Sequence, residues 1–263
     1  MFSIFIYSTG IKDKLTPLIN DLEKNNIEVI MIDSENDFID KGLKRYSDEA
    51  VIISDDVSLL DKLKKYNICR LGALNWQMSP CDFNDVSLVF EGFDDVGYDY
   101  INKMYQRFHN IPWTILQTDR CIVREMTLDD LDALYELYDD DAYRYLEKLS
   151  DNRCEEREKL AAYIENMYKF YEFGLWAVID KQTGKLIGRA GFNCDFSMGY
   201  LIKKEHRNKG IAYEVCNAMI QYANENIKIG EIWCRIDKNN IASVNLAKKL
   251  GFKKYNGCIY KLL

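Results

Sequence analysis

Six consecutive residues near position 210 have the composition of a phosphate-binding loop. The segment 207–212, Arg-Asn-Lys-Gly-Ile-Ala, follows a strand-like stretch at 198–203 and precedes a helical pattern. A loop that enters a helix collects unpaired backbone N–H groups at the positive end of the helix dipole. Gly210 and Ala212 allow phosphate oxygens to approach that backbone closely. The segment therefore predicts either a phosphate-binding loop or a turn whose basic residues are incidental.

The elements around this loop favour the first interpretation. Apolar residues recur after the loop at helical spacing, which predicts a helix with Val215, Met219 and Tyr222 on its buried face. A strand is expected at 231–236, followed by a helix from about 241 that ends at Gly251. A last strand pattern runs from 252 through 260.

This ordered set of motifs resembles the GNAT superfamily of N-acetyltransferases. The matching stretches are 199–202, 207–212, Asn240 with Ala242 and Ser243, and 249–252, and the likeness covers about residues 118–263. The pattern N-x-A-S-x-x-x-A-x-K-L-G-F is most similar to the Rim-type branch, which acetylates protein N-termini among other amines. The resemblance implies an acetyl-coenzyme A-dependent N-acetyltransferase whose acceptor is a primary amine of a small molecule or of a protein N-terminus.

The resemblance also implies where the coenzyme binds. Its pyrophosphate is expected on the backbone amides of 207–212, and its pantetheine along the strand 200–202. Two residues of the following helix region are expected to offer polar side chains. The cofactor-binding residues implied are Tyr200, Leu201, Ile202, Arg207, Asn208, Lys209, Gly210, Ile211, Ala212, Asn240 and Ser243.

Acyl transfer to an amine needs a route for the amine's proton and for protonation of the leaving thiolate. Many family members carry a glutamate two residues before the Gly-Tyr of this strand, where this chain has Ser197. Asp195 is on the same face if the strand extends that far, and otherwise it is a turn residue. The family's frequent tyrosine acid falls at Ala247. The catalytic candidates are Asp195, Ser197 and Tyr200, and proton relay through water is also compatible.

Because this chain lacks the family's glutamate and tyrosine at these two positions, a second function remains open. The chain could be an acyl-coenzyme A-binding sensor or scaffold that lacks efficient catalysis. The acceptor side is expected in 127–173, where the acids at 139–141 and 155–156 either attract a cationic amine or form a solvated face. Aromatic residues there could line a pocket or pack in the core: Tyr163, Tyr168, Phe170, Tyr171, Phe173 and Trp176.

The first 112 residues alternate strand-like and helix-like patterns. Strands are expected at 2–7, 28–33, 50–53, 68–71 and 87–90, with helices near 15–22, 38–46, 55–63 and 98–110. Strands separated by helices imply right-handed crossovers and a doubly wound parallel sheet. Ser54 is the expected N-cap of the third helix, with Asp55 and Asp56 in its first turn.

This half resembles a haloacid-dehalogenase core in short patches, chiefly the stretch 51–56. That family attacks with an aspartate directly after the first strand, whereas this chain has Tyr7-Ser8-Thr9-Gly10 there. Without the nucleophile no aspartyl-phosphate can form. We therefore expect a non-catalytic domain.

Composition agrees with this organisation. The chain has 263 residues, 48% of them hydrophobic, and a net charge of −7. We expect an α/β protein with two domains: residues 1–112 form the parallel-sheet domain, and 113–263 form an α+β acetyltransferase-type domain with a mixed sheet. Eight cysteines without a C-x-x-C pair and only two histidines argue against a metal site or a disulfide scaffold. A pI near 5.1 argues against nucleic-acid binding.

The apolar stretches are too short for a membrane helix, and the first residues read as a strand rather than a leader. The cytoplasm is therefore the expected compartment, and the oligomeric state stays open.

Overall fold

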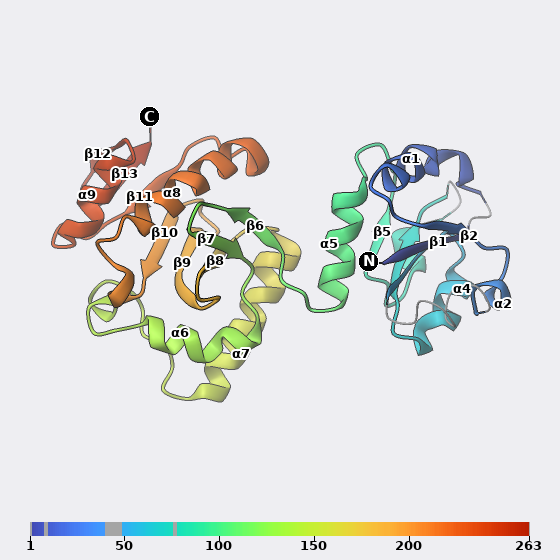
Figure 1. Ribbon diagram of the computed structural model, residues 1–263, viewed down its shortest axis with the longest axis horizontal. Coiled ribbons are helices and arrows are strands. Elements are labelled where there is room, and N and C mark those ends of the chain that lie inside the picture. The colour runs from blue at the N-terminus through green and yellow to red at the C-terminus, as the bar shows by residue number, and fades with distance from the viewer. Residues whose placement is uncertain (1, 8–9, 40–48, 76–77, 263) are drawn as a thin grey trace. The chain divides into compact units, whose positions relative to one another are not determined.

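The computed structural model describes residues 2–7, 10–39, 49–75 and 78–262. The chain divides into two compact units, Met1–Ile111 and Pro112–Leu263, and each is described here by itself (Figure 1). None of the helices in the described ranges is both long enough and apolar enough to cross a membrane.

The N-terminal unit contains a five-stranded sheet in the order β2-β1-β3-β4-β5. Every neighbouring pair is parallel, which confirms the expected doubly wound sheet. The central strands β3 and β4 are buried along their whole length. The strands are β1 (Ser3–Tyr7), β2 (Val29–Met31), β3 (Ala50–Ser54), β4 (Cys69–Ala73) and β5 (Leu88–Phe90).

Helices connect these strands at nearly the expected places. Leu18 and Leu22 give α1 its buried face, and Ile101 and Met104 do the same for α5. The helix expected near 38–46 falls largely outside the described residues. The helices are α1 (Thr16–Lys24), α2 (Glu35–Phe38), α4 (Val57–Lys62) and α5 (Tyr98–Phe108).

The expected cap of the third helix was wrong by two residues. Ser54 pairs with Tyr7 and Gly72 as the last residue of β3, so the strand continues through it. Asp56 caps α4 instead, because its carboxylate accepts the Leu59 N–H at 3.0 Å. Asp55 is buried and accepts the Gly10 N–H at 2.8 Å, which ties the residues after β1 to the end of β3.

The C-terminal unit contains a five-stranded antiparallel sheet in the order β10-β9-β8-β7-β6. The sequence did not reveal β6, because its two end residues are exposed and only its two central residues are apolar. The strands are β6 (Thr114–Gln117), β7 (Cys121–Arg124), β8 (Leu175–Asp180), β9 (Leu186–Phe192) and β10 (Met198–Ile202).

Helices cover both faces of this sheet: α6 and α7 lie on one side and α8 on the other (Figure 1). Trp176 on β8 is fully buried against the Tyr222 ring of α8. The helix expected after residue 210 continues past α8 into a π-helical segment, Ala223–Ile227, and α7 continues into another, Ile164–Phe170. The four helices are α6 (Leu131–Leu137), α7 (Arg153–Tyr163), α8 (Ile211–Tyr222) and α9 (Ile241–Lys249).

A second, three-stranded sheet has the order β11-β13-β12. The strand expected at 252–260 is in fact a hairpin, β12 (Phe252–Asn256) and β13 (Ile259–Leu262), which turns at Gly257 with φ +49°. β11 (Trp233–Arg235) meets β10 through a parallel bridge between Ser197 and Trp233. This bridge makes the strand arrangement mixed, as expected.

Candidate functional site

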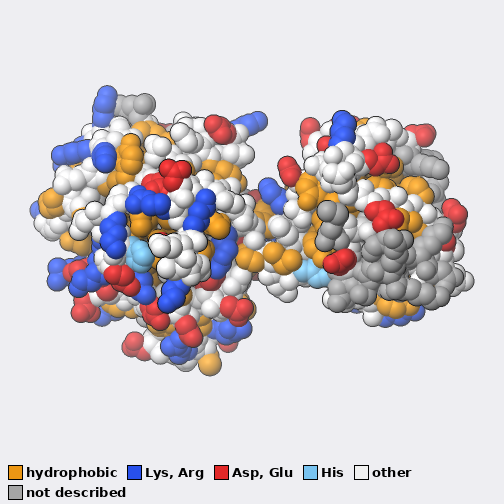
Figure 2. Space-filling view, in the orientation of Figure 1, with side chains coloured by type: hydrophobic (Ala, Val, Ile, Leu, Met, Phe, Trp, Pro, Cys, Tyr) orange, Lys and Arg blue, Asp and Glu red, His pale blue; other side chains and the backbone are white. Residues whose placement is uncertain are grey.

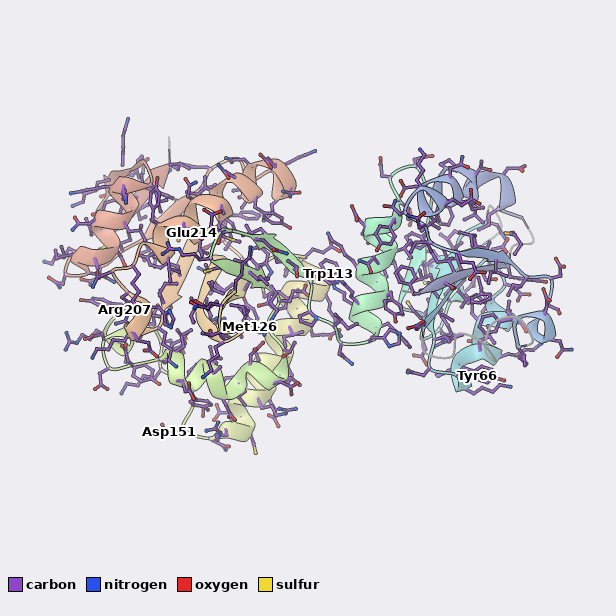
Figure 3. All side chains as sticks on the ribbon, viewed as in Figure 1. Tyr66, Trp113, Met126, Asp151, Arg207 and Glu214 are labelled. Atoms are coloured by element: carbon purple, nitrogen blue, oxygen red, sulfur yellow. The ribbon has the colours of Figure 1, made fainter. Side chains whose placement is uncertain are left out.

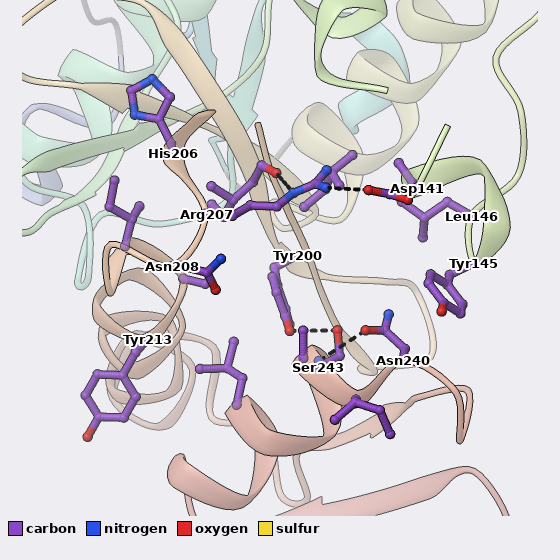
Figure 4. Close-up of a pocket in the computed structure, with 18 of the residues that line it drawn as sticks. Asp141, Tyr145, Leu146, Tyr200, His206, Arg207, Asn208, Tyr213, Asn240 and Ser243 are labelled. Carbon is purple, nitrogen blue, oxygen red and sulfur yellow. Dashed lines mark hydrogen bonds and ion pairs between the residues drawn. The ribbon is translucent and has the colours of Figure 1, made fainter. Parts of the chain in front are cut away.

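A pocket of about 570 Å³ lies where β10 ends and where α8 and α9 begin. Its wall contains all the expected cofactor-binding residues except Lys209. Figure 4 shows Tyr200 standing in its middle, between Asn208 of the loop and Tyr145 of the opposite wall. The expected residues that line it are Tyr200, Leu201, Ile202, Arg207, Asn208, Gly210, Ile211, Ala212, Asn240 and Ser243.

The loop before α8 has the conformation that the phosphate-loop hypothesis requires. Gly210 is the N-cap of α8 with φ +80°, and Asn208 also has a positive φ of 60°. The first intrahelical bond runs from Glu214 N–H to Gly210 C=O. The N–H groups of residues 211–213 therefore have no acceptor within the helix and point from its positive end toward the pocket. This is a suitable site for an anion such as a pyrophosphate.

A long-range ion pair holds this loop in place. The Arg120 side chain donates to the Lys209 carbonyl at 2.8 Å and, through Nε, to the Glu214 carboxylate at 2.7 Å. Burial acts to raise the pKa of Glu214, but hydrogen bonds from Thr118 and Arg120 outweigh it, so that the pKa lies below its ordinary value. Figure 3 shows Glu214 on α8 and Arg207 in the loop region of this unit. Ninety-four residues separate Arg120 from Glu214, so no local pattern could reveal the contact.

The basic side chains near the loop are partly neutralised. Arg207 Nε donates to the Ile202 carbonyl at 2.8 Å, and its terminal nitrogen donates to Asp139 at 3.0 Å. A third contact joins Arg207 to Asp141 at 3.7 Å, and Lys203 pairs with Glu136 at 2.9 Å. The acids at 139–141 and 155–156 were expected either to attract a cationic amine or to form a solvated face. Asp139 and Asp141 lie against Arg207, whereas Glu155 pairs with Lys159 on the surface.

Lys209 is the one expected cofactor-binding residue that does not line the pocket. Its carbonyl is bound by Arg120, its side chain is exposed, and it is absent from the residues that line the pocket. The physical reason is the left-handed turn at Asn208 and Gly210, which directs the residue between them to solvent. Lys and Arg side chains are nevertheless numerous on the face of the C-terminal unit seen in Figure 2.

The edge of β10 presents backbone groups to the pocket. Asn193 N–H donates to the Ser197 carbonyl and Lys203 N–H donates to the Ile187 carbonyl, each across the β9–β10 pair. Bonded and non-bonded pairs alternate along an antiparallel ladder. The N–H and C=O of Tyr200 therefore point away from β9, toward the open edge. An extended ligand could add to this edge by pairing with them.

Asn240 and Ser243 organise the wall opposite the loop. The Asn240 side chain caps α9 by accepting the Ser243 N–H at 3.1 Å. The Tyr200 hydroxyl donates to Ser243 Oγ at 2.9 Å, which joins β10 to α9 (Figure 4). Burial raises the pKa of the Tyr200 phenol above its ordinary value, although the bond to Ser243 acts in the opposite direction. This phenol therefore stays protonated at neutral pH.

Asp195 and Ser197 do not join this pocket. β10 begins at Met198, so the strand does not extend to Asp195, which lies in the turn after β9. The Asp195 carboxylate accepts both the N–H and the Oγ–H of Ser197, at 2.9 and 2.6 Å. Burial opposes these bonds, but together they hold the pKa of Asp195 below its ordinary value. Of the two alternatives for Asp195, base on the strand or turn residue, the structure has the turn residue.

The sequence missed the wall formed by the segment 141–146. Tyr145 and Leu146 line the pocket, and Lys249 lies over the Tyr213 ring at 4.3 Å on another side of it. The short 3-10 turn Ala142–Arg144 leaves no periodic pattern that could have revealed this segment. Of the aromatic residues expected on the acceptor side, Tyr168, Phe173 and Trp176 are core residues, and none of the six lines this pocket.

The C-terminal unit, which contains this pocket, is similar to known proteins. Residues 120–253 match the family model described as an acetyltransferase (GNAT) domain. Two Bacillus subtilis relatives are similar over 147 residues: the uncharacterized protein YkkB, at 29% identity over 52% of this chain and 84% of its own length, and the uncharacterized N-acetyltransferase YoaA, at 28% over 53% and 83%.

Solved structures show the same fold. A Vibrio cholerae protein provisionally named a ribosomal-protein-serine acetyltransferase superposes with a TM-score of 0.50 at 20% identity, covering 57% of this chain and 97% of that protein.

Proposed function

Because the chain belongs to the GNAT acetyltransferase family, we propose that its C-terminal unit is an acetyl-coenzyme A-dependent N-acetyltransferase. Its acceptor would be a primary amine of a small molecule or of a protein N-terminus. The observation that carries the proposal is the pocket that joins the N-terminus of α8 to the open edge of β10.

The residues present suit the two chemical parts of this coenzyme. The amides that follow Gly210 form a site for the pyrophosphate, and the left-handed glycine keeps the approach to them open. The backbone of Tyr200 offers one donor and one acceptor to the amides of the pantetheine arm. When bound, acetyl-coenzyme A supplies an acetyl group activated as a thioester.

The pocket wall limits the ways in which the amine can lose its proton. Of the described residues that line the pocket, Asp141 carries the single carboxylate, and it is paired with Arg207 at 3.7 Å and with Arg144 at 3.5 Å. We assign deprotonation of the amine to water, so that the acceptor reacts as the free base. The amine nitrogen would then bond to the carbonyl carbon, and the carbon–sulfur bond would break with its electron pair going to sulfur. The nitrogen would lose its second proton to solvent, and the released thiolate would take a proton from solvent.

A second candidate follows from the same observation. A chain that binds acyl-coenzyme A in this pocket, where the carboxylate of Asp141 is already paired with two arginines, could act as a sensor or scaffold. The first proposal requires turnover with some amine, whereas the second requires only binding.

A free-thiol assay with an acceptor panel tests the two against each other. The panel contains polyamines, amino acids and peptides, including one with an N-terminal serine because of the name of the Vibrio protein. Amine-dependent release of coenzyme A supports the transferase. Binding of coenzyme A without thiol release from any acceptor would support the sensor.

The N-terminal unit is proposed to be non-catalytic. Asp55, in the stretch that resembles the haloacid dehalogenases, is engaged by the Gly10 N–H at 2.8 Å. Magnesium-dependent turnover of a phosphomonoester that disappears in Asp55→Asn would contradict this proposal.

A further inference from the structure

A second pocket of about 300 Å³ opens beyond Tyr200, and we call it the inner chamber. It shares its mouth with the first pocket, because both are lined by Tyr145, Leu146, Tyr200, Asn240 and Ser243. From this mouth the inner chamber extends to Met198 and Gly199 on β10, to Cys234 and Ile236 at β11, and to α9. A ligand that follows the edge of β10 away from the phosphate loop therefore arrives at its mouth.

The inner chamber exists because small side chains face a gap between strands. β10 and β11 meet at the bridge between Ser197 and Trp233, and beyond it both strands line the chamber. The helix α9 faces this gap with Ser243 and Ala247, four residues apart on one helical face. Neither side chain is long enough to fill the space. Ala247 is only 3% exposed, so it lies at the floor of the chamber and not at its rim.

The floor is apolar and uncharged. Met198, Cys234, Ile236 and Ala247 are each less than 8% exposed. Burial raises the pKa of the Cys234 thiol to about 12, so this side chain is neutral at physiological pH. The charged lining residues, Arg235 and Asp237, are exposed and belong to the rim. A cationic amine would find no charged partner at this floor, whereas a hydrocarbon chain would lose water-exposed surface there.

We propose that the inner chamber binds the acyl chain of the donor and selects acyl groups longer than acetyl, with Ala247 setting the length. This inference rests on the proposed function, since the coenzyme must first occupy the outer pocket. Each methylene that enters an apolar site contributes about a fourfold gain in affinity. A two-carbon acetyl group would leave most of this floor uncovered, and a chain of four to six carbons would cover more of it.

The test is a series of dissociation constants for the full-length chain with free coenzyme A and its acetyl, propionyl, butyryl, hexanoyl and octanoyl thioesters. We expect affinity to rise from acetyl to at least butyryl by several-fold and then to fall. Affinity that is highest for acetyl and decreases with every added methylene would overturn the inference while leaving the proposed function standing. No binding of coenzyme A or of any thioester would overturn the proposed function itself.

Three variants test whether the chain-length dependence of the affinity arises in the inner chamber. Ala247→Leu narrows the inner chamber and should remove the gain in affinity that longer chains show relative to acetyl-coenzyme A. Asn245→Leu adds the same side chain to an exposed position of α9 and should leave the chain-length profile unchanged. Because Ala247→Leu could unfold a tight core, Met198→Ala provides the opposite change: it deepens the floor and should shift the preferred chain to a longer one. A profile that is identical in wild type and Met198→Ala would contradict the assignment of the floor.

Discussion

The Tyr200 hydroxyl donates a hydrogen bond to Ser243 Oγ at 2.9 Å, and this single contact stands at the junction of the two pockets. It connects β10, the strand proposed to pair with the pantetheine, with α9, the helix that lines the inner chamber. Neither residue is near the other in sequence, since 43 positions separate them. The bond therefore joins β10 to α9 directly, through two side chains that are distant in sequence.

Removing this bond should cost stability. Tyr200→Phe keeps the ring but leaves Ser243 Oγ without its donor, and we expect a loss of about 1 kcal/mol in the free energy of unfolding. The measurement is urea unfolding of Tyr200→Phe, Ser243→Ala and the double variant. The double variant should lose less than the sum of the single losses, because both remove the same bond. Strictly additive losses would show that the two groups do not interact in solution.

Arg120 should support coenzyme binding from outside the pocket. Its bonds to the Lys209 carbonyl and to Glu214 hold the loop whose amides form the proposed pyrophosphate site. Arg120→Met should weaken coenzyme A binding by roughly fivefold, the scale of one charge-assisted hydrogen bond. Arg153→Met is the matched control, since Arg153 forms a surface pair with Asp132 and does not line the pocket. Equal affinities in the two variants would show that the loop does not need this support.

The Arg207–Asp139 pair should make stability depend on pH at the acid end. Burial would raise the pKa of Asp139, but the hydrogen bonds from Arg207 and from the Ala142 N–H hold it below its ordinary value. A carboxyl group with a lowered pKa stabilises the folded state above its unfolded pKa of about 3.9 and loses that contribution as pH falls through the folded pKa.

We therefore expect the unfolding free energies of wild type and Asp139→Asn to differ by a constant amount from pH 7 to 5 and to converge below about pH 4. Chemical unfolding at a series of pH values measures this difference. A gap that stays constant down to pH 3 would mean that Asp139 is not stabilised as the carboxylate.

Asp195→Asn should leave turnover within about a factor of two, because Asp195 is a turn residue outside the pocket and not the base. Loss of a general base would instead lower turnover roughly a hundredfold or more. The pH–rate profile gives an independent check: its limb should follow the ionisation of the acceptor amine and be the same in the variant. A limb that vanishes in Asp195→Asn would restore the catalytic role.

Local sequence patterns were sufficient to predict features that lie within a single helix or strand. These features depend on neighbouring residues, whose spacing is fixed by helix and strand geometry. The helical spacing after Gly210 predicted α8, and the structure adds that Gly210 is its left-handed N-cap, with φ +80°. The family resemblance, and not a local pattern, implied a cofactor role for residues 200–202, and the structure places all three in the pocket wall.

Features that depend on distant residues could not be predicted. The pairing of Arg207 with Asp139 joins positions 68 residues apart, so the sequence could not show that this acid is a partner of the loop. β10 begins at Met198, so Asp195 lies in the turn before the strand. Where the strand begins depends on its pairing with β9 and not on Asp195 itself. The inner chamber could not be predicted either, because it lies between β10 and β11, which are joined at the bridge between Ser197 and Trp233.

The measurement that tests the central claim most directly is the thermal stabilisation of the full-length chain by coenzyme A, in wild type and in Gly210→Glu. A ligand at a hundred times its dissociation constant stabilises by about 2.7 kcal/mol, which raises the melting temperature by several degrees. The glutamate would place a like charge at the proposed pyrophosphate site, on a backbone with φ +80°. Gly184→Glu is the control, since Gly184 also has a positive φ, of 67°, but lies in open space.

We predict a clear rise in wild type and in Gly184→Glu and none in Gly210→Glu. The same rise in all three proteins, or no rise in wild type at millimolar coenzyme A, would contradict the assignment of the α8 N-terminus as the coenzyme site.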